Sequence, residues 1–301
     1  MLLQKASPSM LGRGARAPRP AARAAPPRAA ARRRAPLRVA AVLAPGGTTN
    51  PAFNGFGNLN EAIVESRYGS KAPMSVDGTV TKTLGLFALC AAAAAATWVQ
   101  LLTGGPGSFA AVLGASRAAG VVALVCALAS MFKPLWSQFT APVYAVAKGV
   151  ALAGISAYAE VIAPGIAFNT FLLTMSTAAS LLLGLKSGVI RVTDQFSDTV
   201  RAVSGGFFIS MAAVFALSLV GVRMPFLFAS GPLAIGISLV SAGLAAANLL
   251  LDFDYVRQAA ATRRVSRALE WYFAGNILFT LVWFYTSLLR TMLLLTGGSS
   301  D

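Results

Sequence analysis

Histidine is absent from this chain of 301 residues, and acidic residues are scarce, with ten Asp and Glu against 25 Lys and Arg. The absence of histidine removes the commonest general base and the commonest metal ligand. Cys90 and Cys126 both lie inside apolar runs, so they make neither a disulfide framework nor a metal site. The chain also lacks HExxH, GxSxG, P-loop and CxxC motifs. We therefore expect neither an enzyme nor a resident cofactor.

Charged residues of either sign are few, because they make up 12% of the chain whereas hydrophobic residues make up 56%. Soluble domains carry about 25% charged residues, so the composition predicts an integral membrane protein in contact with a lipid bilayer. The net charge of +15 comes largely from residues 1–60, which hold ten Lys and Arg and no acid. Without a basic domain beyond this leader, we expect no binding to nucleic acid.

Residues 1–42 are rich in Ala, Arg and Pro and lack acids, which is typical of a disordered organellar transit peptide. They contain no apolar core of the kind that a secretory signal has. The many prolines disfavour an amphipathic helix, which favours the chloroplast over the mitochondrion. The alternative is a disordered basic arm that binds anionic lipid. Residues 43–82 follow as a polar segment rich in Gly and Asn.

Seven apolar runs follow, each about 19–25 residues long and thus able to cross a bilayer as a helix. They lie at 83–102, 110–131, 141–162, 165–185, 203–221, 227–251 and 271–295. The alternation typical of a membrane barrel is missing, so we predict an all-α domain over 83–296 and a short tail at 297–301. Lys and Arg gather in every second loop, which places the N-terminus on the stromal or matrix side.

Two acids, Asp252 and Asp254, directly follow the uncharged run 232–251. An ionisable side chain at membrane depth costs roughly 2.5–3.5 kcal/mol and therefore marks a functional site. A helix turns about 100° per residue, so the two side chains point to different sides. Asp252 shares a face with Asn248 and Tyr255, and we predict that it is the inward acid and that Asp254 is paired or hydrated. The alternative is that both flank the helix end in the interface.

The last apolar run carries its polar side chains on one helical face. Asn276, Thr280, Trp283, Ser287 and Arg290 recur at intervals of three or four residues. Such a stripe faces protein or water rather than lipid, so we predict that it lines an ion path. The alternatives are packing between helices for Asn276, Thr280 and Ser287, and snorkelling for Arg290. Lys148 and Glu160 are further ionisable candidates at membrane depth.

Six short segments, in order over residues 48–295, are shared with a known family. They are Thr49–Phe53, Met74–Thr83, Leu185–Thr193, Gly231–Gly236, Leu251–Asp254 and Glu270–Tyr272. With them the chain resembles the bacterial-type branch of the Bax inhibitor-like membrane family. The resemblance implies seven helices, with the C-terminal one surrounded by the other six. It also implies a pH-gated leak of calcium or other cations, in which an Asp ending the sixth helix shares a proton with an Asp in the seventh.

Asp252 matches the sixth-helix acid of that scheme, but Thr280 stands where the seventh-helix acid is expected. Two close carboxylates raise one another's pKa and form a titratable latch, which an Asp facing a Thr cannot form. The alternatives for Asp252 are a pair with Lys148 or Arg290, or an exposed cation site that offers oxygen ligands to calcium.

The sequence is compatible with two alternative functions. We predict a calcium or other cation leak channel, or a regulator of organellar ion homeostasis. The alternative is a non-conducting scaffold or assembly and survival factor that acts on membrane proteases or other membrane proteins. Conduction would depend on Asp252, whereas a scaffold would depend on the loop Tyr255–Arg267, which we expect to be exposed.

Overall fold

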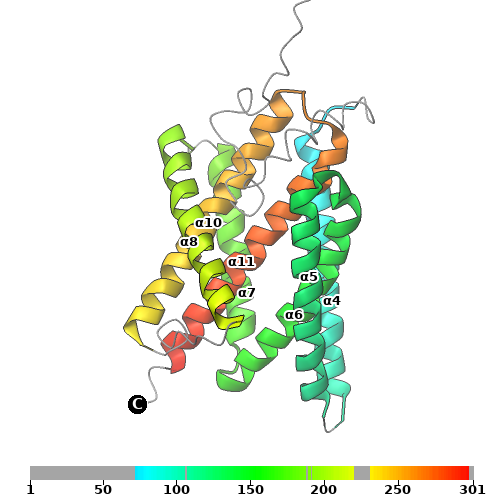
Figure 1. The fold of residues 1–301 in the computed structure, drawn as a ribbon, viewed down its shortest axis with the longest axis vertical. Coiled ribbons are helices and arrows are strands. Elements are labelled where there is room, and N and C mark those ends of the chain that lie inside the picture. Colours follow the sequence, from blue (N-terminus) through cyan, green and yellow to red (C-terminus); the bar gives the residue numbers. More distant parts are fainter. Residues whose placement is uncertain (1–71, 106, 188, 191, 220–230, 298–301) are drawn as a thin grey trace, which may run out of the picture. The chain divides into compact units, whose positions relative to one another are not determined.

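The computed structural model describes residues 72–105, 107–187, 189–190, 192–219 and 231–297. Within these ranges it contains α4 (Val76–Thr103), α5 (Ser108–Phe132), η1 (Pro134–Trp136), α6 (Ser137–Ile162), α7 (Ile166–Ser187), α8 (Asp194–Leu219), α10 (Pro232–Ala261), η2 (Arg267–Leu269) and α11 (Glu270–Gly297) (Figure 1). The all-α prediction is therefore confirmed for the described ranges. The predicted transit peptide, most of the polar segment 43–82 and the tail after Gly297 lie outside them.

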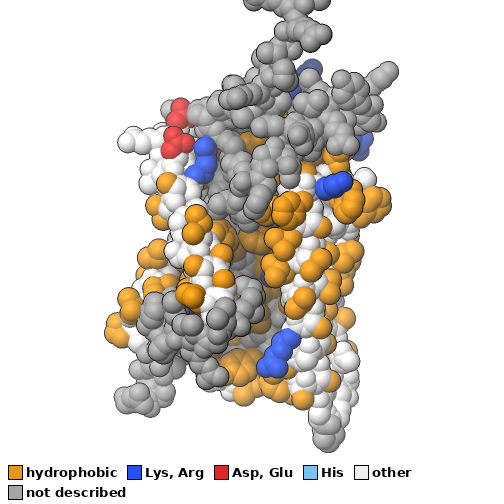
Figure 2. All heavy atoms as spheres, in the orientation of Figure 1, with side chains coloured by type: hydrophobic (Ala, Val, Ile, Leu, Met, Phe, Trp, Pro, Cys, Tyr) orange, Lys and Arg blue, Asp and Glu red, His pale blue; other side chains and the backbone are white. Residues whose placement is uncertain are grey.

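Six of the described helices are long and apolar enough to cross a membrane, namely α4, α5, α6, α7, α10 and α11. The helix α8, whose first turns carry Asp194, Asp198 and Arg201, is not among these six in the described part of the chain. Figure 2 shows hydrophobic side chains spread along the length of one face, with charged side chains toward its two ends. A membrane protein is thus supported, while the arrangement of seven spans stays a prediction.

Three helices, α4, α8 and α10, extend well beyond the apolar runs that predicted them. Helix α8 begins at Asp194, whereas its predicted run begins at 203. Helix α4 begins at Val76, inside the predicted polar segment, since the Ser75 hydroxyl caps it by accepting a hydrogen bond from Gly78 N at 3.0 Å. Helix α10 continues to Ala261, whereas the predicted run ends at 251. Asp252 and Asp254 therefore lie within a helix, and the alternative that both follow its end is excluded.

Helix α11 lies at the centre of the described bundle. It packs against α4, α6, α7 and α10, and its Phe279 and Trp283 rings meet Phe207 and Phe208 of α8 at centroid distances of 4.8–6.5 Å. Half of the apolar stretch is buried in α6, α10 and α11, against 17–22% in α4, α5 and α7. The prediction that six helices surround α11 is thus supported for these five neighbours.

Small residues allow α6 to approach its two neighbours closely. A Cβ added to Gly149 would overlap the backbone of Cys90 in α4, and one added to Gly154 would overlap Ser116 of α5. The Ser116 hydroxyl donates to the carbonyl of Val150 at 3.0 Å. Close backbone packing stabilises helix association in membranes, where lipid tails are as apolar as the side chains. Helices α4, α5 and α6 therefore form a tightly packed group beside α11.

Candidate functional site

The side chain of Asp252, on α10, forms hydrogen bonds with two residues of α11. Its carboxylate accepts one hydrogen bond from Asn276 Nδ2 at 2.8 Å and one from Thr280 Oγ1 at 2.6 Å. Asn276 and Thr280 are four residues apart on α11, so one carboxylate reaches both. All three side chains are buried, and only 2% of Asp252 is exposed. Asp252 thus points toward the neighbouring helix, and its role in function stays a prediction.

Further polar contacts connect the same two helices toward the start of α10. The Ser241 and Ser287 hydroxyls lie 2.8 Å apart, and Trp283 Nε1 donates to Ser241 Oγ at 3.1 Å. The Thr291 hydroxyl donates to Ser238 Oγ at 3.1 Å. We call these five residues, together with Asp252, Asn276 and Thr280, the polar seam. Each contact satisfies groups that would be costly to leave unpaired in hydrocarbon.

Two buried amides flank Asp252 along the seam. Asn248, one turn earlier on α10, donates from Nδ2 to Ser204 Oγ of α8 at 2.6 Å. The Oδ1 atoms of Asn248 and Asn276 are buried and accept no hydrogen bond within the described residues. Oxygens of this kind, with a carboxylate, are the ligands that calcium prefers. No group of three His, Cys, Asp or Glu suited to a metal occurs in the described ranges, so amide and hydroxyl oxygens would complete any cation site.

A cavity of about 370 Å³ lies between α8, α10 and α11 and continues the seam. We call it the seam cavity. Most of its wall is apolar, and hydroxyls of the polar seam make up part of the rest. Its wall includes Ser241, Trp283, Ser287 and the half-buried Arg290. Asp252 of α10 contacts α11 in its first half, whereas Arg290 lies near the end of α11. The cavity therefore lies at the opposite end of the seam from the acid. The residues of the predicted stripe of α11 therefore lie along the polar seam and in the wall of the seam cavity.

The other three predicted residues have local contacts. Asp254 accepts a hydrogen bond from Gln258 of its own helix at 2.6 Å. The Lys148 ammonium lies 6.0 Å from the centre of the Tyr144 ring in the same helix. Glu160 accepts hydrogen bonds from backbone N–H groups around the start of α7, which gives it a capping role there.

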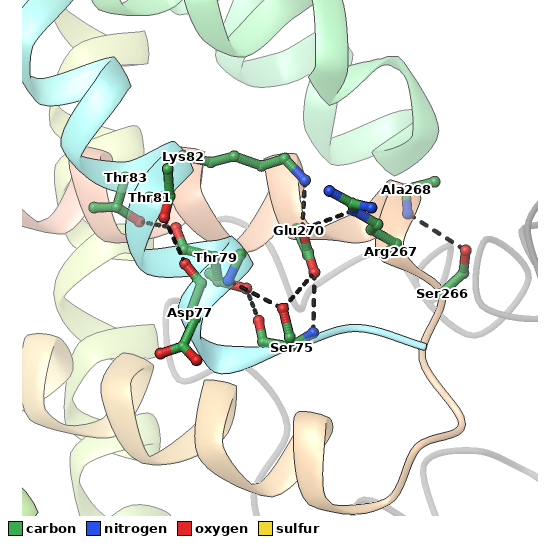
Figure 3. A network of polar contacts seen from close by, with 11 residues as sticks. Ser75, Asp77, Thr79, Thr81, Lys82, Thr83, Ser266, Arg267, Ala268 and Glu270 are labelled. Atoms are coloured by element: carbon green, nitrogen blue, oxygen red, sulfur yellow. Dashed lines mark hydrogen bonds and ion pairs between the residues drawn. The ribbon is translucent and has the colours of Figure 1, made fainter. Parts of the chain in front are cut away.

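Glu270, the first residue of α11, is a buried acid that the sequence reasoning did not select. Its carboxylate accepts hydrogen bonds from Ser75 N at 2.9 Å and from Ser75 Oγ at 3.2 Å (Figure 3). It also pairs with Lys82 Nζ at 2.5 Å, and Arg267 Nε lies 3.9 Å away. A Cβ added to Gly78 would overlap the Glu270 oxygens. Glycine at this position is therefore what allows α4 to approach the acid.

Backbone contacts strengthen this junction. Met74 N donates to the carbonyl of Val265 at 2.8 Å, and Arg267 N donates to that of Ala72 at 3.0 Å. We call residues 72–82 and 265–270, which these contacts join, the clasp. A signal for it was present in the sequence, because the shared segments Met74–Thr83 and Glu270–Tyr272 contain most of it. Acids are common in the first turn of a helix, so the sequence did not distinguish Glu270 from an ordinary residue at a helix start.

Residues 20–297 match the family model described as Bax inhibitor 1 like. The chain belongs to the Bax inhibitor 1-like family. No curated protein and no solved structure matches the chain. In this Bax inhibitor 1-like protein, Thr280 occupies the place where the sequence resemblance implies a second acid, and it donates to Asp252. The contact between α10 and α11 is thus a hydrogen bond to the acid rather than a pair of carboxylates.

Proposed function

We propose that this protein passes calcium or another cation across an organellar membrane, or regulates its passage, along the polar seam under the control of Asp252. The observation that carries the proposal is the buried carboxylate held between two helices by Asn276 and Thr280. A carboxylate at this depth is costly, which makes function the default explanation for it. Its charge attracts cations, and the oxygens nearby are hard ligands suited to calcium.

The seam supplies a closed state and a way to open it. Hydrogen bonds to a charged group are worth about 1.5–3 kcal/mol each, so the two donors of α11 hold α10 firmly. Separation of the helices at this point would expose Asp252, and a cation would replace the two donors. The seam cavity provides space for the ion at the other end of the seam from the acid. Because Thr280 replaces the second acid, we expect opening to depend weakly on pH.

The cellular setting belongs to the same proposal. The basic, Ala- and Pro-rich composition of residues 1–42 supports a cleaved transit peptide, with the chloroplast favoured over the mitochondrion. The distribution of Lys and Arg supports an N-terminus on the stromal or matrix side. We propose no catalytic step and no resident cofactor. A fluorescent fusion of residues 1–60 tests the organelle, because import into mitochondria or retention in the cytosol would contradict the assignment.

Calcium flux into dye-filled liposomes tests conduction. The protein without its leader is reconstituted beside Asp252→Ala, Thr280→Val and the control Asp254→Ala, at about pH 6 and about pH 8 on either side of neutrality. We expect Asp252→Ala to lower the flux, because the cation ligand is lost. We expect Thr280→Val to raise it by about tenfold, since one hydrogen bond that holds the closed state is removed. Asp254→Ala should leave the flux unchanged, because its partner lies on its own helix.

Absence of flux above that of empty liposomes, from protein shown to be folded, would exclude conduction. The alternative is the scaffold or assembly factor, which acts on membrane proteases or other membrane proteins. The prediction of an exposed loop at Tyr255–Arg267 is partly wrong, because α10 extends to Ala261 and Tyr255 and Val265 are buried.

The scaffold is nevertheless favoured by one observation, a group of exposed arginines at that end of the bundle. These are Arg257, Arg263, Arg264 and Arg267. Such a basic surface suits an acidic partner. A scaffold predicts that Arg263→Ala with Arg264→Ala reduces capture of that partner, whereas Asp252→Ala has no effect.

A further inference from the structure

A second cavity, of about 320 Å³, lies on another side of α11, between α4, α6 and α7. We call it the apolar cavity. Its volume falls at the lower end of the roughly 300–1,000 Å³ typical of ligand pockets. Most of its wall is apolar, with Phe87 and Trp98 from α4, Leu152 from α6 and Leu278 from α11. An apolar cavity excludes water and accepts an apolar guest.

The apolar cavity reaches the surface between α4 and α7. Three of its lining residues are exposed there: Ala91 on α4, and Phe168 and Phe171 on α7, with 64% and 38% of their surfaces exposed. The Phe87 and Phe171 rings stack across the two helices at 6.3 Å. Both helices are apolar enough to span a membrane. The mouth of the cavity therefore faces hydrocarbon rather than water.

One end of the apolar cavity is polar. Its wall includes Glu160, two residues before the end of α6, and the hydroxyls of Ser156 and Tyr285, which lie 2.7 Å apart. The carboxylate of Glu160 reaches the turn that leads into α7. The end of a membrane-spanning helix lies at the interface, where lipid headgroups are found. The cavity thus combines an apolar interior with a carboxylate at the headgroup level and two hydroxyls deeper in the bundle.

We propose that the apolar cavity binds one acyl chain of a membrane lipid, which enters between α4 and α7 with its headgroup at the Glu160 end. A lipid tail already lies in hydrocarbon, so its transfer into the cavity gives little hydrophobic free energy. Binding is favourable because the tail makes dispersion contacts with walls that otherwise lack neighbouring atoms. Glu160 favours a headgroup that donates hydrogen bonds, whereas it repels a free fatty acid. This inference is independent of cation conduction, because the apolar cavity and the polar seam use different faces of α11.

Photolabelling tests the occupant. The full chain is reconstituted in phosphatidylcholine vesicles that contain a small fraction of phosphatidylethanolamine with a diazirine in one acyl chain, since the ethanolamine ammonium donates hydrogen bonds. The vesicles are irradiated, and the labelled residues are mapped by mass spectrometry. We expect labels on buried lining residues, namely Cys90, Leu278 and Val282, which are 6%, 1% and 6% exposed. Labels confined to exposed side chains such as Ile155 would overturn the proposal.

A matched pair of variants tests the entrance. Ala91 and Ala92 are neighbouring exposed residues of α4, and Ala91 lines the cavity whereas Ala92 does not. Ala91→Phe should lower labelling of Cys90 and Leu278 by about tenfold, because its ring occupies the mouth. Ala92→Phe should leave the labelling unchanged, and circular dichroism checks that both variants fold. Equal labelling in the two variants would overturn entry between α4 and α7.

Discussion

The apolar cavity and the seam cavity border different faces of the same helix, α11. Leu278, Val282 and Tyr285 line the first, whereas Trp283, Ser287 and Arg290 line the second. Members of each set recur every three or four residues, so a single helix sorts its side chains onto two faces. The comparison teaches that neighbouring residues of one helix can line separate cavities, because they lie on different faces. One face carries Leu278 and Val282, and the other carries the hydroxyl of Ser287 and the guanidinium of Arg290.

The two faces also differ in how they are closed. Along the polar seam, donors and acceptors on α10 and α11 meet because each would be costly to leave unpaired in hydrocarbon. Across the apolar cavity, α4 and α7 meet through the rings of Phe87 and Phe171. Ring contacts rely on dispersion, which is weak for each atom pair and lost at small gaps. Both kinds of contact leave space beside them, because the hydrogen-bonded Ser241 and Ser287 line the seam cavity just as Phe87 and Phe171 line the apolar cavity.

The largest effect on stability is expected at the clasp, which fixes the start of α11 and so the rotation of both faces. Glu270→Gln would leave Lys82, only 17% exposed, without its anionic partner. We expect a loss of about 3 kcal/mol in the free energy of unfolding, measured by thermal denaturation in detergent. The control is Asp198→Asn, because Asp198 is 67% exposed in its pair with Arg201 and the loss should stay below about 1 kcal/mol. Equal losses in the two variants would contradict a structural clasp.

An intermediate difference in stability is expected between removal of a threonine hydroxyl from the polar seam and removal of one from the wall of the apolar cavity. Thr280→Val removes a hydrogen bond to the buried Asp252 and should destabilise the protein by about 1.5–3 kcal/mol. Thr174→Val is the matched change in the apolar cavity, where the hydroxyl donates to Thr170 of its own helix. We expect a smaller cost, about 0.5–1 kcal/mol, because this hydrogen bond joins two uncharged groups of one helix. Similar losses of stability in the two variants would mean that the hydroxyl of Thr280 contributes no more to stability than that of Thr174.

The smallest expected effect is the coupling energy within one hydroxyl pair on each face. A double-mutant cycle on Ser241→Ala and Ser287→Ala should give a coupling energy of about 0.6 kcal/mol, the average for such bonds in membranes. A cycle on Ser156→Ala and Tyr285→Phe, beside the apolar cavity, should give a similar value. Equal couplings would show that the faces differ in the number of polar contacts, not in their strength. A much larger coupling in the seam would instead point to cooperativity along it.

Much of the fold and part of the site could be predicted because they depend on local patterns. Hydrophobic runs place helices, and a period of 3.6 residues puts Asn276, Thr280 and Ser287 on one face and separates Asp252 from Asp254. The same patterns misplace helix ends. The apolar run stops at Leu251, but α10 continues to Ala261 because charged residues outside hydrocarbon remain compatible with a helix.

By itself, the sequence determined an all-helical membrane protein of the Bax inhibitor 1-like family and the faces on which its polar residues lie. The tertiary structure alone decided which residues meet. Asp252 contacts Asn276 and Thr280, which are 24 and 28 positions away, and Glu270 contacts Ser75 across 195 positions. Such contacts depend on how helices pack and rotate against one another, and no local periodicity encodes that. For the same physical reason only the packed bundle shows that the two clasp segments meet and that a cavity lies between α4, α6 and α7.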